Sequence, residues 1–414
     1  MKGNIADASL APRGKEKIDW VKSHMPVMAE IEDELSREKP FADHKIGVSI
    51  HLEAKTARLA IALAEAGGEV YITSSNPLST QDDVAAALNE HEGVTVFSRW
   101  GVSEEEYEKQ LEQVLGNEPD LIIDDGGDLV KQLHGPLEEL SSGIIGGAEE
   151  TTTGIHRLKA LDREDRLNFP MFAVNDARMK YLFDNRYGTG QSTWDAITRT
   201  TNLTVAGSTA VVVGYGWCGR GIAKIADGMG ADVIVVEVDP VKALEAKMDG
   251  HRIMNIEEAA PLGDFFVTAT GNIKVIPRRA LAKMKDKAVL ANAGHFDVEI
   301  DLDALEDLST SREEVRENVE RFETKDGREL FLLAQGRLVN LAAGDGHPAE
   351  IMDISFALQT LTAEHVVKTD GLQDQLYSVP EEVDNRVAKM KLRSMGVEID
   401  DLSPEQQEYL EKFN

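Results

Sequence analysis

The sequence contains a single cysteine, Cys218, among 414 residues. One thiol excludes an internal disulfide framework and a cysteine-based zinc site, and it fits a reducing cytoplasm. No stretch approaches the roughly 18 uninterrupted apolar residues of a membrane-spanning helix, and the first residues lack the apolar core of a secretory signal. We therefore expect a cytoplasmic protein, and no residue pattern predicts a metal site.

Positive charge is also scarce. The chain has 44 Lys and Arg against 74 Asp and Glu, a formal net charge of -30 at pH 7. Phosphate backbones and anionic lipids repel such a protein, which argues against nucleic acid or a membrane surface as its partner. The length exceeds what one hydrophobic core usually organises, and a hydrophobic content of 42% is typical of globular proteins, so two or three domains are expected.

Short apolar stretches alternate with segments of helical periodicity, which is typical of a parallel α/β sheet. The first series has strands expected at 46–50, 69–73, 94–98 and 121–125. A second series starts at 209 with TAVVVGYG, and GRLVNLAAGDGHP (336–348) is expected to supply its last strand. The sequence therefore predicts an α/β fold with two domains.

Two segments after these series carry further predictions. The helix expected after Pro348 has an amphipathic pattern and should pack back on the first unit, which would make that domain discontinuous. The highly charged span 306–330 has no apolar stripe, and we interpret it as a solvated excursion.

The strongest local motif is a glycine-rich turn between a strand and a helix. Gly214, Gly216 and Gly219 have GxGxxG spacing, and a second strand ends at Glu237. Such glycines let the backbone approach a pyrophosphate at the helix N-terminus, and an acid at the end of the second strand accepts hydrogen bonds from a ribose diol. The pattern predicts a Rossmann domain that binds NAD rather than NADP, although Lys242 is a basic residue near the expected ribose.

Several longer motifs, in order along roughly 45–410, resemble those of one family, the S-adenosyl-L-homocysteine hydrolases. They are LSTQDD (78–83), DDGGDLV (124–130), EETTTGIHRL (149–158), NDARMKYLFDNRYG (175–188), GYGWCGRG (214–221), GHFDVEID (294–301) and GRLVNLAAGDGHP (336–348). The resemblance implies reversible hydrolysis of an S-nucleosyl-L-homocysteine in the methyl cycle, with a tightly bound NAD that is not consumed. It also implies a homotetramer whose cleft closes between two domains, with hinges near 185–190 and 344–348.

The resemblance implies a domain plan. We expect a substrate-binding domain formed by 1–187 and 347–390, a Rossmann NAD-binding domain over 188–346, and a short C-terminal segment over 391–414. The long-tailed family members extend further, with a lysine and a tyrosine that reach a neighbouring subunit's NAD. The present sequence ends at LEKFN, so we expect NAD to be held less tightly or by other groups. The missing tail and HLEAK resemble archaeal and thermophilic bacterial members.

The same resemblance assigns catalytic roles. Lys180 is the base that assists oxidation of the ribose 3′-hydroxyl, which requires neighbours that lower its pKa. Asp125 and His51 transfer protons at C4′ and C5′. The other residues expected at the sugar and in the cleft are Glu150, Asp184, Asn185, His295 and His347.

Further residues are expected at the cofactor by the same resemblance. They are Thr151, Thr152, Thr153, Asn185, Trp217, Cys218, Thr270, Gly271, Asn272, Ala293, Gly294, His295, Asn340 and His347, with Asn340 on the last Rossmann strand and His347 in a hinge.

The stretch HLEAKT (51–56) departs from the family pattern. The family has Thr, then Gln or Glu, at the positions of Glu53 and Lys55, and these side chains face the purine edge, with Thr56 beside them. Hypoxanthine offers an acceptor at O6 and a donor at N1, so Lys55 and Glu53 match it better than adenine. The alternative is that the two residues form a salt bridge and adenine binds through other atoms.

Other interpretations stay open at the level of sequence. Lys180 and Asp184 are four residues apart and could form a surface ion pair, DDGGD could be a turn, and EETTTG could be a helix cap. The Rossmann motif alone is also compatible with a dehydrogenase that releases NADH, and the family resemblance with a non-catalytic NAD-binding relative.

Overall fold

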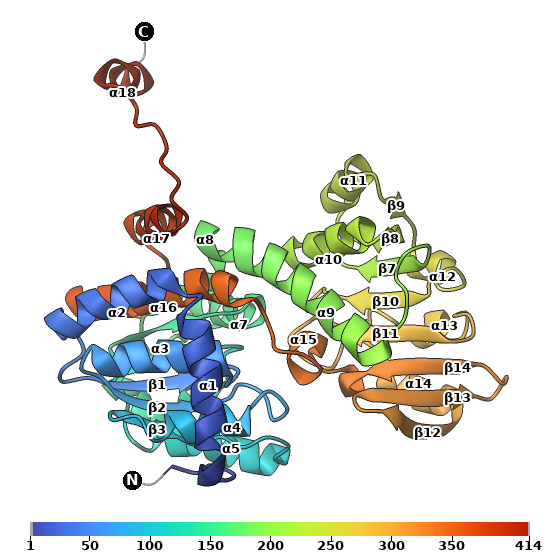
Figure 1. Cartoon of the computed structure of the whole chain (residues 1–414), viewed down its shortest axis with the longest axis horizontal. Helices are drawn as coiled ribbons and strands as arrows, with labels where there is room; N and C mark the ends of the chain where they lie inside the picture. Colours follow the sequence, from blue (N-terminus) through green and yellow to red (C-terminus); the bar gives the residue numbers. More distant parts are fainter. Residues whose placement is uncertain (1–2, 413–414) are drawn as a thin grey trace.

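Two separate sheets, one parallel and one mostly parallel, build the protein, and helices cover both faces of each (Figure 1). The computed structural model describes residues 3–412, so the outer ends of the segments expected at 1–187 and 391–414 lie outside the described residues. Both parts are doubly wound, which confirms the α/β class and the presence of two domains.

The first sheet has seven strands in the order β15-β6-β5-β4-β1-β2-β3, all parallel. The strands are β1 (Lys45–Ser49), β2 (Glu69–Thr73), β3 (Val94–Val96), β4 (Leu121–Asp124), β5 (Gly146–Glu149), β6 (Met171–Ala173) and β15 (Leu376–Ser378). Since β15 follows the second sheet in sequence but pairs with β6, the first domain is discontinuous, as predicted.

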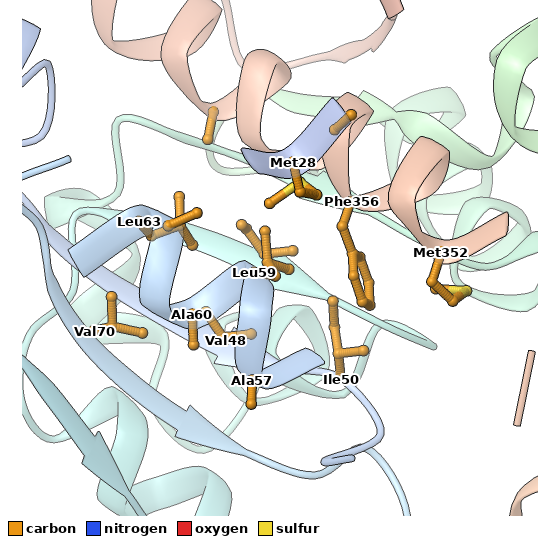
Figure 2. Packing of buried hydrophobic residues seen from close by; sticks show 14 of the residues in the cluster. Met28, Val48, Ile50, Ala57, Leu59, Ala60, Leu63, Val70, Met352 and Phe356 are labelled. Carbon is orange, nitrogen blue, oxygen red and sulfur yellow. The ribbon is translucent and has the colours of Figure 1, made fainter. Parts of the chain in front are cut away.

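Alternate side chains of these strands enter different cores, because both faces of the sheet are covered. Leu121 and Ile123 of β4 join the cluster under α2, α3 and α16, whereas Ile122 joins the opposite cluster. Figure 2 shows the first cluster, which includes Val48 of β1, Leu59 of α3 and Met28 of α2. The continuous apolar runs of the sequence therefore reflect burial on two faces.

The helices of this domain come from both ends of the chain. They are α1 (Ala11–Lys22), α2 (Pro26–Glu38), α3 (Ala54–Glu65), α4 (Asp82–Leu88), α5 (Glu104–Leu115), α6 (Asp128–Leu133), α7 (Thr152–Arg163), α8 (Arg178–Lys180), α16 (Ala349–Lys368) and α17 (Glu381–Ser394), with short 3-10 turns η1 (Ala8–Leu10), η2 (Glu138–Gly143) and η3 (Val174–Asp176).

Helix α16 packs on the first domain as predicted, but it is not amphipathic. It contacts α2, α3 and α17 as well as β5, so its buried residues run all round its circumference. The sequence pattern misled because a helix enclosed by neighbours on several sides needs no polar face.

The second sheet has eight strands in the order β12-β13-β14-β11-β10-β7-β8-β9. They are β7 (Thr209–Val213), β8 (Asp232–Val236), β9 (Arg252–Ile253), β10 (Phe265–Thr268), β11 (Ala288–Asn292), β12 (Ser309–Arg316), β13 (Val319–Thr324) and β14 (Glu329–Leu333). From β9 to β14 the strands are parallel in the Rossmann order 3-2-1-4-5-6.

The charged span 306–330 is not a solvated excursion, and this prediction was wrong. Strands β12 and β13 form an antiparallel hairpin that extends the sheet beyond β14. Val319 and Phe322 are buried beneath it, whereas nearly all of β12 is exposed. An exposed edge strand carries charges on both faces, so the alternation that predicts a strand is hidden.

The helices around this sheet are α9 (Thr189–Thr201), α10 (Trp217–Gly228), α11 (Pro240–Met248), α12 (Ile256–Ala259), α13 (Arg278–Leu281), α14 (Leu302–Leu308) and α15 (Val339–Ala342), with a 3-10 turn η5 (Ala334–Gly336). The sequence analysis placed Asn340 on the last Rossmann strand, and this prediction was wrong. Asn340 lies on α15, because β14 ends earlier, at Leu333.

Two connections complete the chain. The π-helix η4 (Tyr181–Gly188) joins α8 to α9, and so leads from the first domain to the second. After α17 an exposed segment extends away from the remainder of the protein to α18 (Pro404–Glu411) (Figure 1). Within residues 3–412, every helix is too short or too polar to cross a membrane.

Candidate active site

A cavity of about 1070 Å³ lies between the carboxyl ends of the two sheets. In each sheet the strand order reverses beside the first strand, and loops at such a point form a crevice. The loops after β1 and β4 contribute His51 and Asp125, and the loops after β7 and β10 contribute Gly214 and Gly271. All the predicted site residues line this cavity except Gly219.

The glycine-rich turn after β7 has the shape that a pyrophosphate requires. Gly214 has φ +100, which favours glycine, and a Cβ on Gly219 would lie 1.9 Å from the Gly214 carbonyl oxygen. Gly219 therefore allows α10 to pack tightly on the turn, although it does not line the cavity. A Cβ on Gly216 would meet no atom within 4 Å, since it would point into open space at the N-terminus of α10.

Glu237 follows β8 and closes this end of the cavity. Its carboxylate accepts hydrogen bonds from the backbone N–H groups of Tyr215 and Val238, each at 2.7 Å. The Lys242 ammonium lies 3.9 Å from Asp239, so an anionic neighbour partly offsets its charge.

The loop after β10 depends on a residue that the sequence analysis missed. The buried carboxylate of Glu299 accepts the N–H groups of Thr270 at 3.0 Å and Gly271 at 2.8 Å. Glu299 belongs to the GHFDVEID motif, which was the available signal. It fixes the loop that carries Thr270, Gly271 and Asn272.

The centre of the cavity holds a buried lysine between two carboxylates. The Lys180 Nζ lies 3.1 Å from Asp184 Oδ1 and 3.3 Å from Glu150 Oε1, and it donates to Asn185 Oδ1 at 2.9 Å. All four residues are buried, so Lys180 and Asp184 do not form a surface ion pair. Glu150 follows β5, while the others come from α8 and η4.

The charges in this cluster determine which group titrates near neutral pH. Burial lowers the pKa of Lys180, but the carboxylates of Asp184 and Glu150 outweigh it, so the pKa lies above its ordinary value. Burial raises the pKa of Glu150 to about 7, although the Lys180 ammonium opposes this change. The condition that we set for Lys180 as a base, a lowered pKa, is therefore not met.

Asp184 behaves differently from Glu150. Burial raises its pKa, but Lys180 and His347 lower it by more, so the pKa lies well below the ordinary value. His347 Nδ1 is 3.2 Å from Asp184 Oδ1, and the Ser355 hydroxyl donates to Asp184 Oδ2 at 2.7 Å. Asp184 is thus a permanent counter-ion of Lys180.

A second group of side chains lies at the switch point of the first sheet. One ring nitrogen each of His51 and His295 and one carboxylate oxygen of Asp125 lie within 4.8 Å of one another. His51 Nδ1 is 2.7 Å from the Ser79 hydroxyl, and its Nε2 is 3.5 Å from Asp125 Oδ2. Burial lowers the pKa of His51 to about 4 against the opposing effect of Asp125, so the imidazole is neutral at pH 7.

The stretch HLEAKT both begins a helix and lines the cavity. Glu53 is the N-cap of α3, and its carboxylate accepts the N–H groups of Lys55 at 3.0 Å and Thr56 at 3.3 Å. The Lys55 ammonium is 2.6 Å from Glu53 and donates to the Asp345 carbonyl oxygen at 2.8 Å. The salt bridge of the alternative interpretation is therefore present.

Other residues at the site were not predicted individually. Asn175, in the NDARMK motif, donates to Thr152 at 3.0 Å and accepts from Asn185 at 3.0 Å. Met352 and Phe356 line the cavity from α16, four residues apart. Their only sequence signal was the helical period, which does not tell a cavity wall from a core.

A doubly wound domain with a glycine-rich dinucleotide turn faces, across one cavity, a second domain with buried acid and base groups. This arrangement defines a dinucleotide-dependent enzyme of two α/β domains. The family model described as "S-adenosyl-L-homocysteine hydrolase, NAD binding domain" matches residues 185–346, and that described as "S-adenosyl-L-homocysteine hydrolase" matches residues 2–141. The chain belongs to the S-adenosyl-L-homocysteine hydrolase family.

Relatives match over nearly the whole chain. Adenosylhomocysteinase of Pyrococcus abyssi is 56% identical over 410 residues, which are 99% of this chain and 97% of the relative. Adenosylhomocysteinase of Aquifex aeolicus is 52% identical over 414 residues, which are 100% of this chain and 99% of the relative. S-inosyl-L-homocysteine hydrolase of Methanopyrus kandleri is 53% identical over 411 residues, which are 99% of this chain and 97% of the relative.

NAD is the cofactor of the matched domain, and the second sheet fits it. The open space at Gly216 leaves room for a pyrophosphate at the N-terminus of α10, and Glu237 follows β8, the position at which Rossmann domains carry an acid for the ribose diol. The residues able to hold NAD thus come from the loops after β7, β8 and β10.

Proposed function

We propose that the protein hydrolyses an S-nucleosyl-L-homocysteine reversibly to a nucleoside and L-homocysteine. The observation that carries the proposal is the buried Lys180, Glu150 and Asp184 cluster, which shares one cavity with a dinucleotide turn. Bound NAD supplies a reversible hydride acceptor for the ribose 3′ carbon. The relatives named above act on S-adenosyl- or S-inosyl-homocysteine, as their names state.

The chemistry explains why both halves of the cavity are needed. A thioether at C5′ is a poor target for direct attack by water. Oxidation of the 3′-hydroxyl to a ketone makes the C4′ hydrogen acidic, because its carbanion is stabilised as an enolate. Homocysteine can then leave, water adds to the enone, and reduction of the ketone gives the nucleoside.

We assign the oxidation step to the Lys180 cluster in a revised form. Lys180 is an ammonium at neutral pH, so it donates a hydrogen bond to the ribose oxygen. Glu150, with a pKa of about 7, is the group that can take up the proton released from the 3′-hydroxyl. Asp184 keeps Lys180 charged, and Asn185 orients it at 2.9 Å.

We assign proton transfer at C4′ and C5′ to the second group. Asp125 Oδ1 is buried without a hydrogen-bond partner in the described residues, which suits a carboxylate that accepts the C4′ proton. The neutral His51 can pass a proton through Nε2 at C5′, while Ser79 holds Nδ1. His295 completes this side of the cleft.

We propose that the inosyl substrate is preferred. Relatives of both names match at similar identity, so identity does not choose between them. Glu53 accepts from the backbone N–H groups of Lys55 and Thr56, and the Lys55 ammonium, which is bound to Glu53 and to the Asp345 carbonyl oxygen, has a third N–H with which it can donate to the base. An ammonium donates to O6 of hypoxanthine, whereas it opposes the 6-amino donor of adenine.

Steady-state turnover of S-inosyl- and S-adenosyl-homocysteine tests these proposals, with added NAD and detection of the released thiol. A preference of about 10² for the inosyl compound is expected. A higher rate on the adenosyl compound would refute the base preference alone. Net NADH release without thiol would instead indicate a dehydrogenase, and a lack of turnover on both would refute the hydrolase proposal.

We further propose a homotetramer whose domains close on the cavity, with boundaries at 187/188, 346/347 and 390/391. Gly188 lies in the first predicted hinge and packs against the ring of His347 in the second hinge. A Cβ added to Gly188 would lie 2.8 Å from His347 Nδ1. Leu402 and Tyr409 in the C-terminal segment are exposed and offer apolar surface to another subunit.

Light scattering of the 45.4 kDa chain would show a single-chain mass if the assembly were absent. The cytoplasmic location stays a prediction from the single cysteine.

A further inference from the structure

Helix α16 runs directly behind the Lys180 cluster. Its side chains at Met352 and Phe356 line the cavity next to Ile50, and Figure 2 labels all three. Ser355 and Gln359 do not line the cavity, and both have an exposed fraction of 0%. Most buried hydroxyl and amide donors in proteins are hydrogen-bonded, and both of these are.

Their partners are the two carboxylates beside Lys180. Glu150 points Oε1 at the Lys180 ammonium, 3.3 Å away, and accepts from Gln359 Nε2 through Oε2 at 2.5 Å. Asp184 points Oδ1 at the ammonium, 3.1 Å away, and accepts from the Ser355 hydroxyl through Oδ2 at 2.7 Å. Each carboxylate thus lies between the Lys180 ammonium, with which it forms an ion pair, and one neutral hydrogen-bond donor from α16.

We propose that Gln359 is a positioning residue that holds the Glu150 carboxylate ready to accept a proton, while Ser355 holds Asp184 as the fixed counter-ion of Lys180. This inference rests on the proposed function and deepens it, since it names the residue that adjusts the proton acceptor. Neither side chain touches the cavity, so both act through the carboxylate that each one binds.

The neighbours of Glu150 determine the sign of the effect. Lys180 favours its charged form, whereas burial and the carboxylates of Asp184 and Asp125 disfavour it. The Gln359 amide is the neutral donor to the charged form, so its removal raises the pKa of Glu150. The proton then stays on Glu150 to higher pH.

Asp184 responds differently to the loss of its donor. Lys180 and His347 keep its pKa well below the ordinary range, so the loss of Ser355 leaves it ionised at every pH at which the enzyme is assayed. Removing the two donors should therefore give two distinct pH profiles, although both donors lie on one helix and both are buried.

The test compares Gln359→Met with Ser355→Ala in the holoenzyme. Met has nearly the shape of Gln without its amide. We expect Gln359→Met to move the acidic limb of the kcat profile upward by about one pH unit, with a loss of about tenfold below the limb. Ser355→Ala should lower kcat without moving the limb.

Thr362→Val is the matched control on α16. The Thr362 side chain is fully buried, and its hydroxyl has no partner among the described residues, so this change should leave both kcat and the limb unchanged. Should Gln359→Met fold poorly, Gln359→Asn keeps an amide that is too short to reach Glu150, and it should move the limb in the same direction.

A second measurement does not depend on turnover. Infrared difference spectra of the holoenzyme report the carboxylic acid stretch of Glu150 against pH, identified by its loss in Glu150→Gln. Gln359→Met should shift this titration upward. An unchanged titration, or an equal shift in Ser355→Ala, would overturn the inference. Absent turnover in the unaltered enzyme would refute only the proposed function.

Discussion

The two sheets have the same strand order at their centres but hold opposite kinds of chemistry at the carboxyl ends of their strands. The first sheet places His51 and Asp125 after β1 and β4, and the second places Gly214 and Gly271 after β7 and β10. One crevice carries titratable side chains, and the other carries backbone groups that glycine leaves accessible. The topology provides the crevice, and the residues at the strand ends decide what it can do.

The two crevices also differ in how much charge they bury. Asp124 and Glu149 face each other on β4 and β5, directly before Asp125 and Glu150. Burial raises the pKa of Asp124 to about 7 and that of Glu149 well above its ordinary value. In the second sheet the principal buried acid is Glu299, whose carboxylate is satisfied by loop N–H groups. The first domain thus buries the ionisable groups that acid and base chemistry requires, whereas the cofactor domain buries few of them.

The largest effect is expected from removal of the central cation. Lys180→Met leaves Glu150 and Asp184 facing each other without an ammonium, so kcat should fall about 10³-fold. NAD affinity, measured by titration calorimetry, should change little because the glycine turn is intact. Lys159→Met removes an exposed lysine that pairs with Asp176, and it should leave both quantities unchanged. A comparable loss of NAD affinity would show that the two crevices are not separable.

Gly219→Ala should produce the reverse pattern. The added Cβ would lie 1.9 Å from the Gly214 carbonyl oxygen, so the turn must shift. We expect NAD affinity to fall about 10²-fold, which corresponds to overpacking of 1–3 kcal/mol. Gly228→Ala on the same helix meets no atom within 4 Å and is the control. Unaltered NAD binding in Gly219→Ala would contradict the assigned turn.

A smaller effect is expected at the base. Lys55→Gln replaces the ammonium by an amide that both donates and accepts, as the family pattern has there. The ratio of turnover on the inosyl and adenosyl substrates should fall by about 30-fold. Lys17→Gln, which removes a half-buried lysine bound to Asp83, should leave the ratio unchanged. An unaltered ratio in Lys55→Gln would leave Lys55 with the structural role of binding Asp345.

The smallest effect concerns stability and pH. Burial lowers the pKa of His51 to about 4 from 6.5, so the unfolded chain binds a proton that the folded protein does not. The folded protein therefore loses stability as pH falls from 6.5 toward 4. The free energy of unfolding of the unaltered protein should fall between pH 7 and pH 5, and in His51→Gln this fall should be smaller by about 2 kcal/mol. His91→Gln, at a partly exposed histidine that lies 3.3 Å from Glu65, is the control, and equal losses in both variants would contradict this account.

The central strands and the dinucleotide turn could be predicted because local patterns specify them. Short apolar runs mark strands buried on both faces, and the glycine spacing reflects a steric requirement at one turn. The β12–β13 hairpin was missed, since most of its side chains face solvent. The short α15 was taken for a strand because its residues Val339–Ala342 are apolar apart from Asn340 and follow Leu338 directly.

The sequence by itself determined the fold class and the cofactor turn, because periodicity and glycine spacing are local, and its resemblance to one family supplied most of the polar residues expected at the cavity. Only the tertiary structure decided what those residues can do. Glu150 rather than Lys180 titrates near pH 7, because two carboxylates and one ammonium are buried together. Ser355 and Gln359 reach the site because α16 packs behind the Lys180 cluster. Gln359 binds Glu150 although the two residues are 209 positions apart in the sequence. Charges distant in sequence interact strongly only when folding removes the water between them.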